Sequence, residues 1–383
     1  MKQAKGYILK DICGVPYILP YGQNIADRKR GVRLNESGEF LWNSLASPIS
    51  RETLLSNFAS HYQARPQMLP DLENDLDQFL QTLSALGMID FCEEHEYLIG
   101  GIRLCLLGHP DCIPEEFLPF TQSAPAHDTV LKLTIELLPA ADSVYHPVNT
   151  QNNHLLLENA ELTIHQVTNG FLFHFPTMTH LKHGFLSLDG THAKLFYELP
   201  YEALLREELF HAIRFLYLYL AEKNDIYAIH SASILYKGKA WLFSGPSGTG
   251  KSTHTNLWKT LYQTPVLNGD LNLLAFENGT PVIHGLPWCG TSGISDIHTY
   301  PLGGILLLRQ DKTDFIEDLS MDEKALLLMQ RLISPIWNEQ QLDCCLRFSE
   351  KLMRKCYVAR LHCTKEDSAA RTMKHAIDEQ LNN

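Results

Sequence analysis

The sequence predicts a multidomain protein with an α+β N-terminal unit, a β-rich middle lobe and an α/β C-terminal domain. Its 383 residues are more than one ordinary hydrophobic core holds, so two or three domains are expected. The hydrophobic pattern changes twice along the chain, which divides it into residues 1–95, 96–200 and 201–383. A hydrophobic fraction of 45% is typical of globular proteins.

The bulk composition excludes several classes of protein. The formal net charge of −12 argues against a nucleic-acid partner, because a nucleic-acid binder presents a basic face. No apolar run approaches the roughly 18 residues that cross a bilayer, and the first residues lack the apolar segment of a secretory signal. The nine cysteines include no CxxC pair, which fits reduced thiols better than disulfides or zinc. A cytoplasmic protein with no membrane partner is expected.

Residues 1–95 are predicted to form three short strands and three helices. The strands are expected at 7–9, 17–19 and 31–34, and the helices begin after Asn35, Ser50 and Pro70. Asn35 is a preferred N-cap, because its side-chain oxygen accepts a bond from a free backbone N–H. Gly87 is a natural helix stop, since it adopts left-handed backbone angles without strain. Together these elements predict a small winged-helix-like unit.

The middle segment is predicted to be rich in β-strands, whereas the C-terminal segment is predicted to alternate strands and helices. Short strands are expected at 129–135, 154–157, 162–167, 170–175, 184–188 and 193–197, packing on an amphipathic helix over 201–222. Strands at 229–236, 239–244 and 266–268 then surround a helix ending near Tyr262, which predicts α/β architecture. A helical tail follows, interrupted by a last strand at 356–362.

Residues 245–252, GPSGTGKS, match the P-loop pattern GxxxxGK[ST] in full. An apolar strand leads in and a helix leads out, which is the setting that phosphate binding requires. Glycines let backbone N–H groups turn inward to form a nest for phosphate oxygens, and the helix N-terminus adds partial positive charge. Lys251 is expected to contact the β- and γ-phosphates, and the Ser252 hydroxyl to bind Mg²⁺. The residues expected to bind ATP are Gly245, Ser247, Gly248, Thr249, Gly250, Lys251, Ser252 and Thr253.

Further residues are candidates for the chemistry, each with a structural alternative. Asp270 ends a short strand where an acid would bind the metal or accept a proton, although a turn aspartate fits the same pattern. His230 ends the strand before the P-loop and is either near the phosphates or in the core. Pro287, Trp288 and Gly290 form either a loop that closes over the acceptor or a turn anchored by tryptophan.

Several segments between residues 229 and 370 resemble the kinase domain of HPr kinase/phosphorylase. They are IHSASI at 229–234, the P-loop, LNGD at 267–270, GLPWCG at 285–290 and VARLHCT at 358–364. They are more closely similar to the HPr-kinase-like proteins encoded beside ribosomally made, modified peptides. The resemblance implies a P-loop fold akin to ATP-dependent phosphoenolpyruvate carboxykinase, with ATP and Mg²⁺ used to phosphorylate a serine-type hydroxyl. It also suggests a homo-oligomer, because HPr kinases assemble as oligomers.

The resemblance assigns roles by position. It makes His230 the active-site histidine, Lys251 and Ser252 the phosphate and metal residues, and Asp270 the acid. Two positions depart from the family pattern. Gly269 stands where HPr kinases carry the first of two aspartates, and Thr291 stands where relatives often carry a lysine after GTPWSG.

The first hundred residues resemble PqqD, the peptide-recognition element of peptide-modifying systems. The resemblance rests on LNESG at 34–38, Leu41, Trp42, Leu45, Tyr62, DLDQFL at 75–80, Leu83 and Gly87. It implies a domain that captures the leader of a precursor peptide as an added β-strand, in which edge-strand backbone groups supply affinity. The residues expected to hold the peptide are Gly31, Val32, Arg33 and Leu34 on the edge strand, with Asp75 and Phe79 on the facing helix.

The sequence thus favours a peptide kinase whose N-terminal domain holds a leader while the P-loop domain phosphorylates a serine or threonine. Tethering raises the effective concentration of the acceptor near the P-loop. Two alternatives stay open. One is a kinase for another protein or a small hydroxyl compound, and the other is a nucleotide-binding but non-catalytic peptide chaperone.

Overall fold

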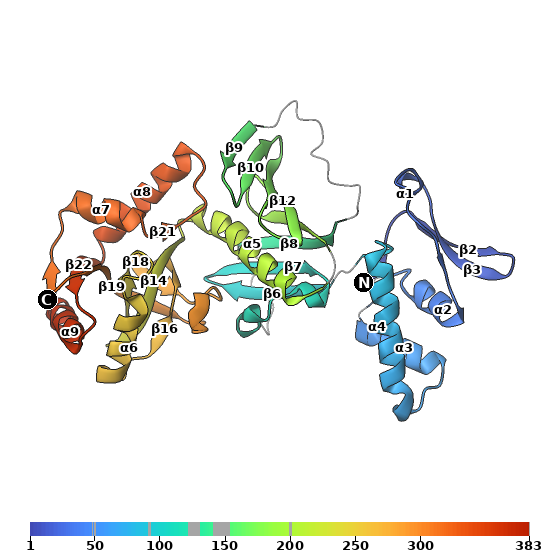
Figure 1. The fold of residues 1–383 in the computed structure, drawn as a ribbon, viewed down its shortest axis with the longest axis horizontal. Helices are drawn as coiled ribbons and strands as arrows, with labels where there is room; N and C mark the ends of the chain where they lie inside the picture. The colour runs from blue at the N-terminus through green and yellow to red at the C-terminus, as the bar shows by residue number, and fades with distance from the viewer. Residues whose placement is uncertain are drawn as a thin grey trace.

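The computed structural model describes residues 1–47, 49, 51–90, 93–121, 131–140, 154–198 and 201–382. Three units follow one another along an elongated molecule (Figure 1). The N-terminal helices and hairpin lie at one end, the C-terminal sheet lies at the other, and a separate sheet with one long helix lies between them (Figure 1). Within the described residues, no helix is both long and apolar enough to span a bilayer.

The N-terminal unit combines small sheets with a helical layer. Its elements are β1 (Lys2–Gln3), β2 (Tyr7–Ile12), β3 (Val15–Pro20), α1 (Gln23–Ala26), β4 (Val32–Arg33), α2 (Glu36–Ser44), α3 (Arg51–His61), η1 (Pro66–Met68), α4 (Leu69–Ala85) and β5 (Ile89–Asp90). Strands β2, β3 and β4 form an antiparallel sheet with β4 at one edge, and β1 pairs with β5. As predicted, Asn35 caps α2 by accepting a 2.8 Å bond from the Gly38 N–H. Ser50, the predicted start of α3, lies outside the described residues.

The middle unit is an eight-stranded mixed sheet. Its strands are β6 (Glu93–Ile99), β7 (Ile102–Gly108), β8 (Lys132–Pro139), β9 (His154–Glu158), β10 (Thr163–Val167), β11 (Gly170–His174), β12 (Leu181–Ser187) and β13 (His192–Tyr197). They lie in the order β6-β7-β8-β13-β12-β11-β10-β9, with the short helices η2 (Pro110–Cys112) and η3 (Glu115–Phe120) after β7. The expected boundary at residue 95 falls inside β6, which pairs with β7 along its whole length. Strand β8 begins at Lys132, and the first two residues of its expected range lie outside the described residues.

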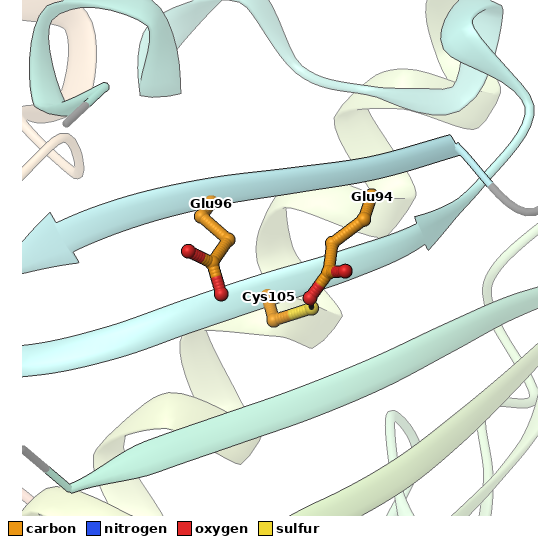
Figure 2. Close-up of side chains that lie close together, drawn as sticks. All are labelled: Glu94, Glu96 and Cys105. Atoms are coloured by element: carbon orange, nitrogen blue, oxygen red, sulfur yellow. Dashed lines mark hydrogen bonds between the residues drawn. The ribbon is translucent and has the colours of Figure 1, made fainter. Parts of the chain in front are cut away.

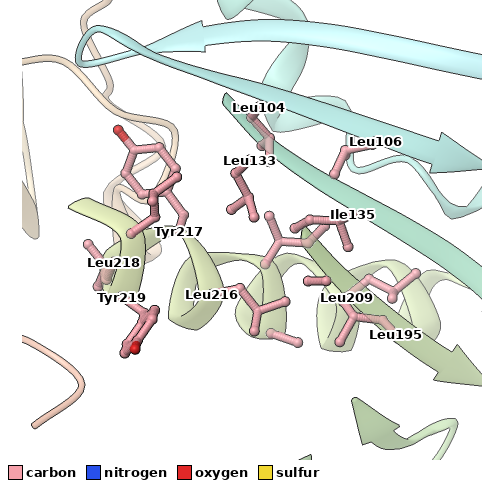
Figure 3. Packing of buried hydrophobic residues seen from close by; sticks show 14 of the residues in the cluster. Leu104, Leu106, Leu133, Ile135, Leu195, Leu209, Leu216, Tyr217, Leu218 and Tyr219 are labelled. Carbon is pink, nitrogen blue, oxygen red and sulfur yellow. The ribbon is translucent and has the colours of Figure 1, made fainter. Parts of the chain in front are cut away.

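Helix α5 (Ala203–Glu222) packs against the middle sheet, as the sequence predicted. Leu209 and Leu216 point from the helix toward Ile135 and Leu195 of the strands (Figure 3). All four side chains are buried, and burying a leucine contributes roughly 1.5–3 kcal/mol. The same core also contains Trp288 from the C-terminal unit. The middle sheet and the P-loop domain therefore share one hydrophobic core.

The C-terminal unit contains nine strands and four α-helices among the described residues. They are β14 (Tyr227–Tyr236), β15 (Lys239–Ser244), α6 (Lys251–Tyr262), β16 (Val266–Asn268), β17 (Leu271–Glu277), β18 (Thr280–His284), β19 (Thr299–Gln310), β20 (Phe315–Glu317), α7 (Met321–Met329), β21 (Leu332–Ile333), α8 (Glu339–Met353), β22 (Tyr357–Cys363) and α9 (Asp367–Asn382). Strand β15 lies between β14, which is antiparallel to it, and β19, which is parallel. Strand β19 is also parallel to β22. The expected helical tail and its strand at 356–362 are present as α7, α8, α9 and β22, but the tail also contains β20 and β21. Strands β17, β18 and β19 were not foreseen.

Candidate active site

The P-loop lies at the end of β15, where the chain turns into α6. Its sharp path needs glycine, because Gly248 and Gly250 adopt φ angles of 79° and 106°, which side-chain-bearing residues rarely adopt. Gly250 is the N-cap of α6, so the first free N–H groups of the helix face the turn. The hydroxyl of Ser244, the last residue of β15, donates a 2.7 Å bond to the carbonyl of His230. The loop is therefore fixed to β14 as well as to its own helix.

Bonds within the loop hold its shape. The Thr249 hydroxyl donates to the Pro246 carbonyl at 2.7 Å, and the Gln310 side chain donates to the Gly248 carbonyl at 3.0 Å. Lys251 as a whole residue is 9% exposed, and its ammonium donates to the Gly245 carbonyl at 3.2 Å. Burial lowers the pKa of Lys251, while the charge of Asp270 opposes that shift. An ammonium has three N–H donors, and Lys251 uses one of them on the Gly245 carbonyl. Lys251 is thus a cation held across the loop that can donate further hydrogen bonds.

A pocket of about 390 Å³ opens over this loop. It is lined by His230, Ser247, Gly248, Gly250, Lys251, Ser252, Thr253, Gly269, Asp270, Cys289, Thr291 and Ser292. Six of the eight residues predicted to bind ATP are in this lining. The other two, Gly245 and Thr249, are outside the lining and lie close to each other, because a Cβ at Gly245 would come within 2.6 Å of the Thr249 hydroxyl. A cradle of backbone amides with one ammonium suits the oxygens of a triphosphate.

His230 and Asp270 meet at the edge of this pocket. The His230 Nε2 atom lies 3.1 Å from the Asp270 Oδ1 atom. The hydrogen bond from His230 is the main reason that the pKa of Asp270 lies below its usual value, and the charges of His230, Lys251 and Arg214 add to it. Asp270 is therefore ionised and can accept a hydrogen bond or ligate a cation. Both residues line the same pocket as the P-loop residues Lys251 and Ser252.

The turn that presents Asp270 is held by buried polar side chains. The Asn268 Oδ1 atom accepts bonds from the N–H groups of Asp270 and Leu271 at 2.9 and 3.1 Å. The Ser231 N–H donates to the Asp270 carbonyl at 2.9 Å. The Ser233 hydroxyl donates to the Asn272 side chain at 2.7 Å and accepts from the Asn268 N–H. Sequence reasoning missed this network, although serines at alternate positions of an apolar strand were a visible signal.

Trp288 anchors the loop that follows β18. Its side chain is 1% exposed, and the indole N–H donates a 3.1 Å bond to the carbonyl of Phe210 in α5. The ring contacts Phe117, Phe210 and Tyr217 at centroid distances between 5.2 and 5.8 Å. Trp288 therefore anchors a turn, which was the structural alternative to a loop that closes over the acceptor. The two expected neighbours Pro287 and Gly290 nevertheless line a pocket, as does one edge of Trp288.

That second pocket measures about 630 Å³ and adjoins the first. It is lined by Glu115, Glu116, Ala203, Arg206, Glu207, Phe210, His211, Arg214, Pro287, Trp288, Cys289, Gly290, Thr291 and Gly293. Cys289 and Thr291 belong to the lining of both pockets. Gly290 touches Asp270 from this side, because a Cβ there would lie 2.8 Å from the Asp270 Cβ. Asp270, which lines the first pocket, therefore lies next to the wall of the second pocket.

Ser292 occupies the space beside Gly269. A Cβ at Gly269 would overlap the Ser292 side chain. The Ser292 hydroxyl donates a 2.7 Å bond to the Cys289 carbonyl and accepts one from the Ile294 N–H. The space beside Gly269 is thus filled by a serine from the neighbouring loop.

A third pocket, of about 620 Å³, lies in the N-terminal unit between β4 and α4. It is lined by Val32, Arg33, Leu34, Asn35, Ser37, Gly38, Leu41, Phe58, Asp75, Gln78, Phe79, Thr82 and Leu83. Five of the six residues predicted to hold a peptide lie in this groove. The sixth, Gly31, packs against β3 instead, because its Cβ position is 2.9 Å from the Ile18 carbonyl. Strand β4 pairs only with β3 among the described strands, so its other edge faces the groove.

One group of potential metal ligands lies outside these pockets. Glu94 and Glu96 of β6 lie close to Cys105 of β7 (Figure 2). The Lys132 ammonium lies 3.1 Å from both carboxylates, and the Cys105 thiol donates to Glu94 at 2.9 Å. Burial raises the pKa of Cys105 to about 12, so the thiol is not the thiolate that metals bind. Lys132 pairs with both carboxylates and the Arg103 guanidinium lies 3.8 Å from Glu96, so these side chains form an ion-pair network.

Comparisons with known proteins bear on the N-terminal unit. Residues 25–89 match the family model described as "Coenzyme PQQ synthesis protein D (PqqD)". No curated protein matches the chain. Among solved structures, the Hpr(Ser) kinase/phosphatase from Coxiella burnetii matches at 10% identity and a TM-score of 0.22, over 40% of this chain and 94% of that chain. The protein is therefore a multidomain chain of mixed α and β structure that carries a PqqD domain at residues 25–89.

Proposed function

We propose that the protein is an ATP-dependent peptide kinase. In this proposal the groove between β4 and α4 holds the leader of a ribosomally made precursor, and the C-terminal unit phosphorylates a serine or threonine of the same peptide. The PqqD match supports the peptide partner. The observation that carries the kinase assignment is the His230–Asp270 pair, 3.1 Å apart, in the same pocket as Lys251 and the P-loop.

The phosphate pocket is suited to ATP. Backbone N–H groups of the loop and of the first turn of α6 would hold the phosphate oxygens, and Lys251 would neutralise their charge. Ser252 and Asp270 line the pocket together and offer the hydroxyl and carboxylate oxygens that Mg²⁺ prefers. When bound, Mg²⁺ would screen the negative charge of the triphosphate.

The reaction needs alignment and one proton acceptor. The acceptor hydroxyl oxygen forms a bond to the γ-phosphorus as the bond from that phosphorus to the β–γ bridging oxygen breaks, and ADP leaves. The hydroxyl proton passes to the Asp270 carboxylate, which the low pKa keeps ionised before the reaction. The second pocket opens beside Asp270 and has the size to hold the peptide segment that carries the hydroxyl.

The leader groove supplies selectivity. An extended peptide beside β4 would satisfy the free backbone groups of that edge, and Leu34 and Phe79 offer apolar contacts along the groove. Holding the leader keeps the acceptor at an effective concentration of roughly millimolar near Asp270. The acceptor pocket then needs little sequence preference of its own.

The test uses the full-length protein, ATP, Mg²⁺ and candidate precursor peptides from the short open reading frames that neighbour its gene. We expect one added phosphate in the peptide mass, and none with Lys251→Ala. Phe79→Ala should raise the peptide Kd by roughly 10–100-fold while leaving the melting-temperature shift by ATP unchanged. Glu73→Ala is the matched control on α4, because Glu73 lies outside the groove and binds Arg51. A wild-type protein that leaves every tested hydroxyl unmodified would rule out the kinase.

A non-catalytic peptide chaperone is the second candidate. Gly269 and Thr291 favour it, since both stand where HPr kinases carry charged residues. It predicts that ATP raises the melting temperature and that the peptide binds, with neither hydrolysis nor transfer. A kinase acting on another protein or a small hydroxyl compound predicts instead that turnover survives Phe79→Ala at every peptide concentration.

A further inference from the structure

Helix α5 carries a basic residue from the middle unit to the boundary between the phosphate and acceptor pockets. Arg214 lies in the part of α5 that approaches Trp288, and it lines the acceptor pocket together with Cys289, Gly290 and Thr291. Cys289 and Thr291 also line the phosphate pocket. Gly290, between them, abuts Asp270. Arg214 and Asp270 therefore both lie near the residues shared by the two pockets, and the charge of each shifts the pKa of the other toward its ionised form.

Arg214 has no hydrogen bond and no ion pair with any residue that the structure describes. Its side chain is half-buried, and this burial lowers the pKa of the guanidinium. A guanidinium offers five N–H donors in a planar fork, so leaving all of them without a partner among the described residues in a half-buried position is costly. By contrast, Arg206 on the same helix reaches the Asp111 carbonyl at 3.5 Å. An unpaired, half-buried guanidinium beside a phosphate pocket indicates a binding site for an anion.

We infer that Arg214 contacts the γ-phosphate of the bound nucleotide and holds it for transfer. The inference rests on the proposed function, and it adds a residue that no motif contains. Lys251 reaches the phosphates from the P-loop side, whereas Arg214 reaches them from the acceptor side. Two oxygens of one phosphate fit the planar fork of an arginine, which a lysine cannot reproduce.

Arg214 also places a positive charge in the wall of the acceptor pocket, beside the neutral residues Cys289 and Thr291. Because α5 packs on the middle sheet, that sheet becomes part of the active site. The phosphate pocket would then be incomplete in a P-loop unit without α5.

Nucleotide preference provides a test that does not depend on turnover. ATP and ADP differ by the γ-phosphate, so the ratio of their dissociation constants reports the contact directly. We expect the wild-type protein to bind ATP more tightly than ADP and Arg214→Met to lose that preference, with ADP affinity unchanged. Methionine keeps the aliphatic stem, so packing around α5 is retained. Arg214→Lys should restore only part of the preference, because it restores charge without the fork.

Turnover provides the second readout. With the precursor peptide as acceptor, Arg214→Met should lower kcat by on the order of 100-fold or more. Lys223→Ala is the control, because it removes an exposed cation directly after the same helix and outside both pockets. Equal ATP-to-ADP ratios for the wild type and Arg214→Met, or no preference in the wild type, would overturn the inference. If the preference depends on Arg214 while no peptide is phosphorylated, the anion site stands and the kinase proposal fails.

Discussion

The imidazole of His230 and the carboxylate of Asp270 lie 3.1 Å apart, although 39 residues separate them in the sequence. Strand β14 brings them together, because the Ser231 N–H bonds to the carbonyl of Asp270. The pair joins β14, the strand before the P-loop strand β15, to the turn between β16 and β17. Four predictions follow from this pair and from other contacts in the molecule.

The His230 contact should set the acid limit of activity. Because His230 lowers the pKa of Asp270, the ionised base persists to lower pH than an ordinary aspartate and is lost as the pH falls through that lowered pKa. Removing the imidazole with His230→Ala should raise the pKa of Asp270 and move the acid limb of the pH profile of kcat/KM to higher pH. The measurement is phosphate incorporation from about pH 3 to 8, in roughly half-unit steps, so that the range extends below the usual aspartate value of 3.8. An acid limb at the same pH in both proteins would contradict the assignment.

Gly269 should not accept a side chain while Ser292 is present. Gly269→Ala places its methyl group against the Ser292 side chain, and such overpacking costs about 1–3 kcal/mol. In the double variant Gly269→Ala with Ser292→Gly, the nearest remaining neighbour is the Cys289 carbonyl at 3.7 Å. We therefore expect urea unfolding to show a smaller loss when the glycine change is made in the Ser292→Gly background. Equal losses in both backgrounds would show that the two positions are independent.

The distance between groove and P-loop should set a minimum peptide length. The N-terminal and P-loop units lie at opposite ends of the molecule (Figure 1), and α4 meets the start of α5 through a 2.9 Å bond between Ser84 and Tyr201. The helical path from Phe79 to Ser84 and from Tyr201 to Arg214 measures about 27 Å at 1.5 Å per residue. An extended peptide, at about 3.4 Å per residue, needs roughly eight residues or more to follow it.

A series of precursor peptides with shortened spacers between leader and acceptor tests this length. Phosphorylation should fall steeply when the spacer drops well below about eight residues, while leader binding stays constant. Mass spectrometry measures the first quantity and fluorescence anisotropy the second. Unchanged phosphorylation with a spacer of two or three residues would place the acceptor elsewhere.

Glu222 should make stability depend on pH. Its side chain is 6% exposed at the end of α5, accepts a 3.0 Å bond from the Ser334 hydroxyl, and burial raises its pKa from 4.5 to about 7. The unfolded chain ionises near pH 4.5 and the folded chain near pH 7, so this group's contribution to stability is complete below pH 4.5 and is lost as the pH rises through 7.

Glu222→Gln removes this titration. We expect the variant to gain stability relative to the wild type between pH 5 and 8, by roughly 1–3 kcal/mol, as measured by urea unfolding at both pH values. Glu379→Gln on exposed α9 provides the control, since an exposed carboxylate meets no burial penalty. A constant difference between Glu222→Gln and wild type across this range would refute the assignment.

Local signals predicted the parts of the site that are continuous in sequence. The P-loop glycines, the Asn35 cap and the apolar face of α4 each depend on residues within one or two turns, so short patterns reveal them. Strand β19 gave no comparable signal, because its buried apolar run lacks the alternation of a half-exposed strand. Arg214 could not be found at all, because its place beside the phosphate pocket depends on how α5 packs between two sheets.

The shared core around Trp288 limits how the chain can be divided. Leu271, Leu273, Leu286 and Trp288 belong to the P-loop unit in sequence but to the core of the middle sheet in space. A fragment starting at β14 would expose these side chains and would be expected to aggregate. The N-terminal unit instead has its own core, which includes Trp42, Leu54 and Leu76. If the N-terminal unit binds the peptide as proposed, we expect that it can be exchanged for a recognition domain of different specificity. The middle and C-terminal units share one core and should be kept together in any such exchange.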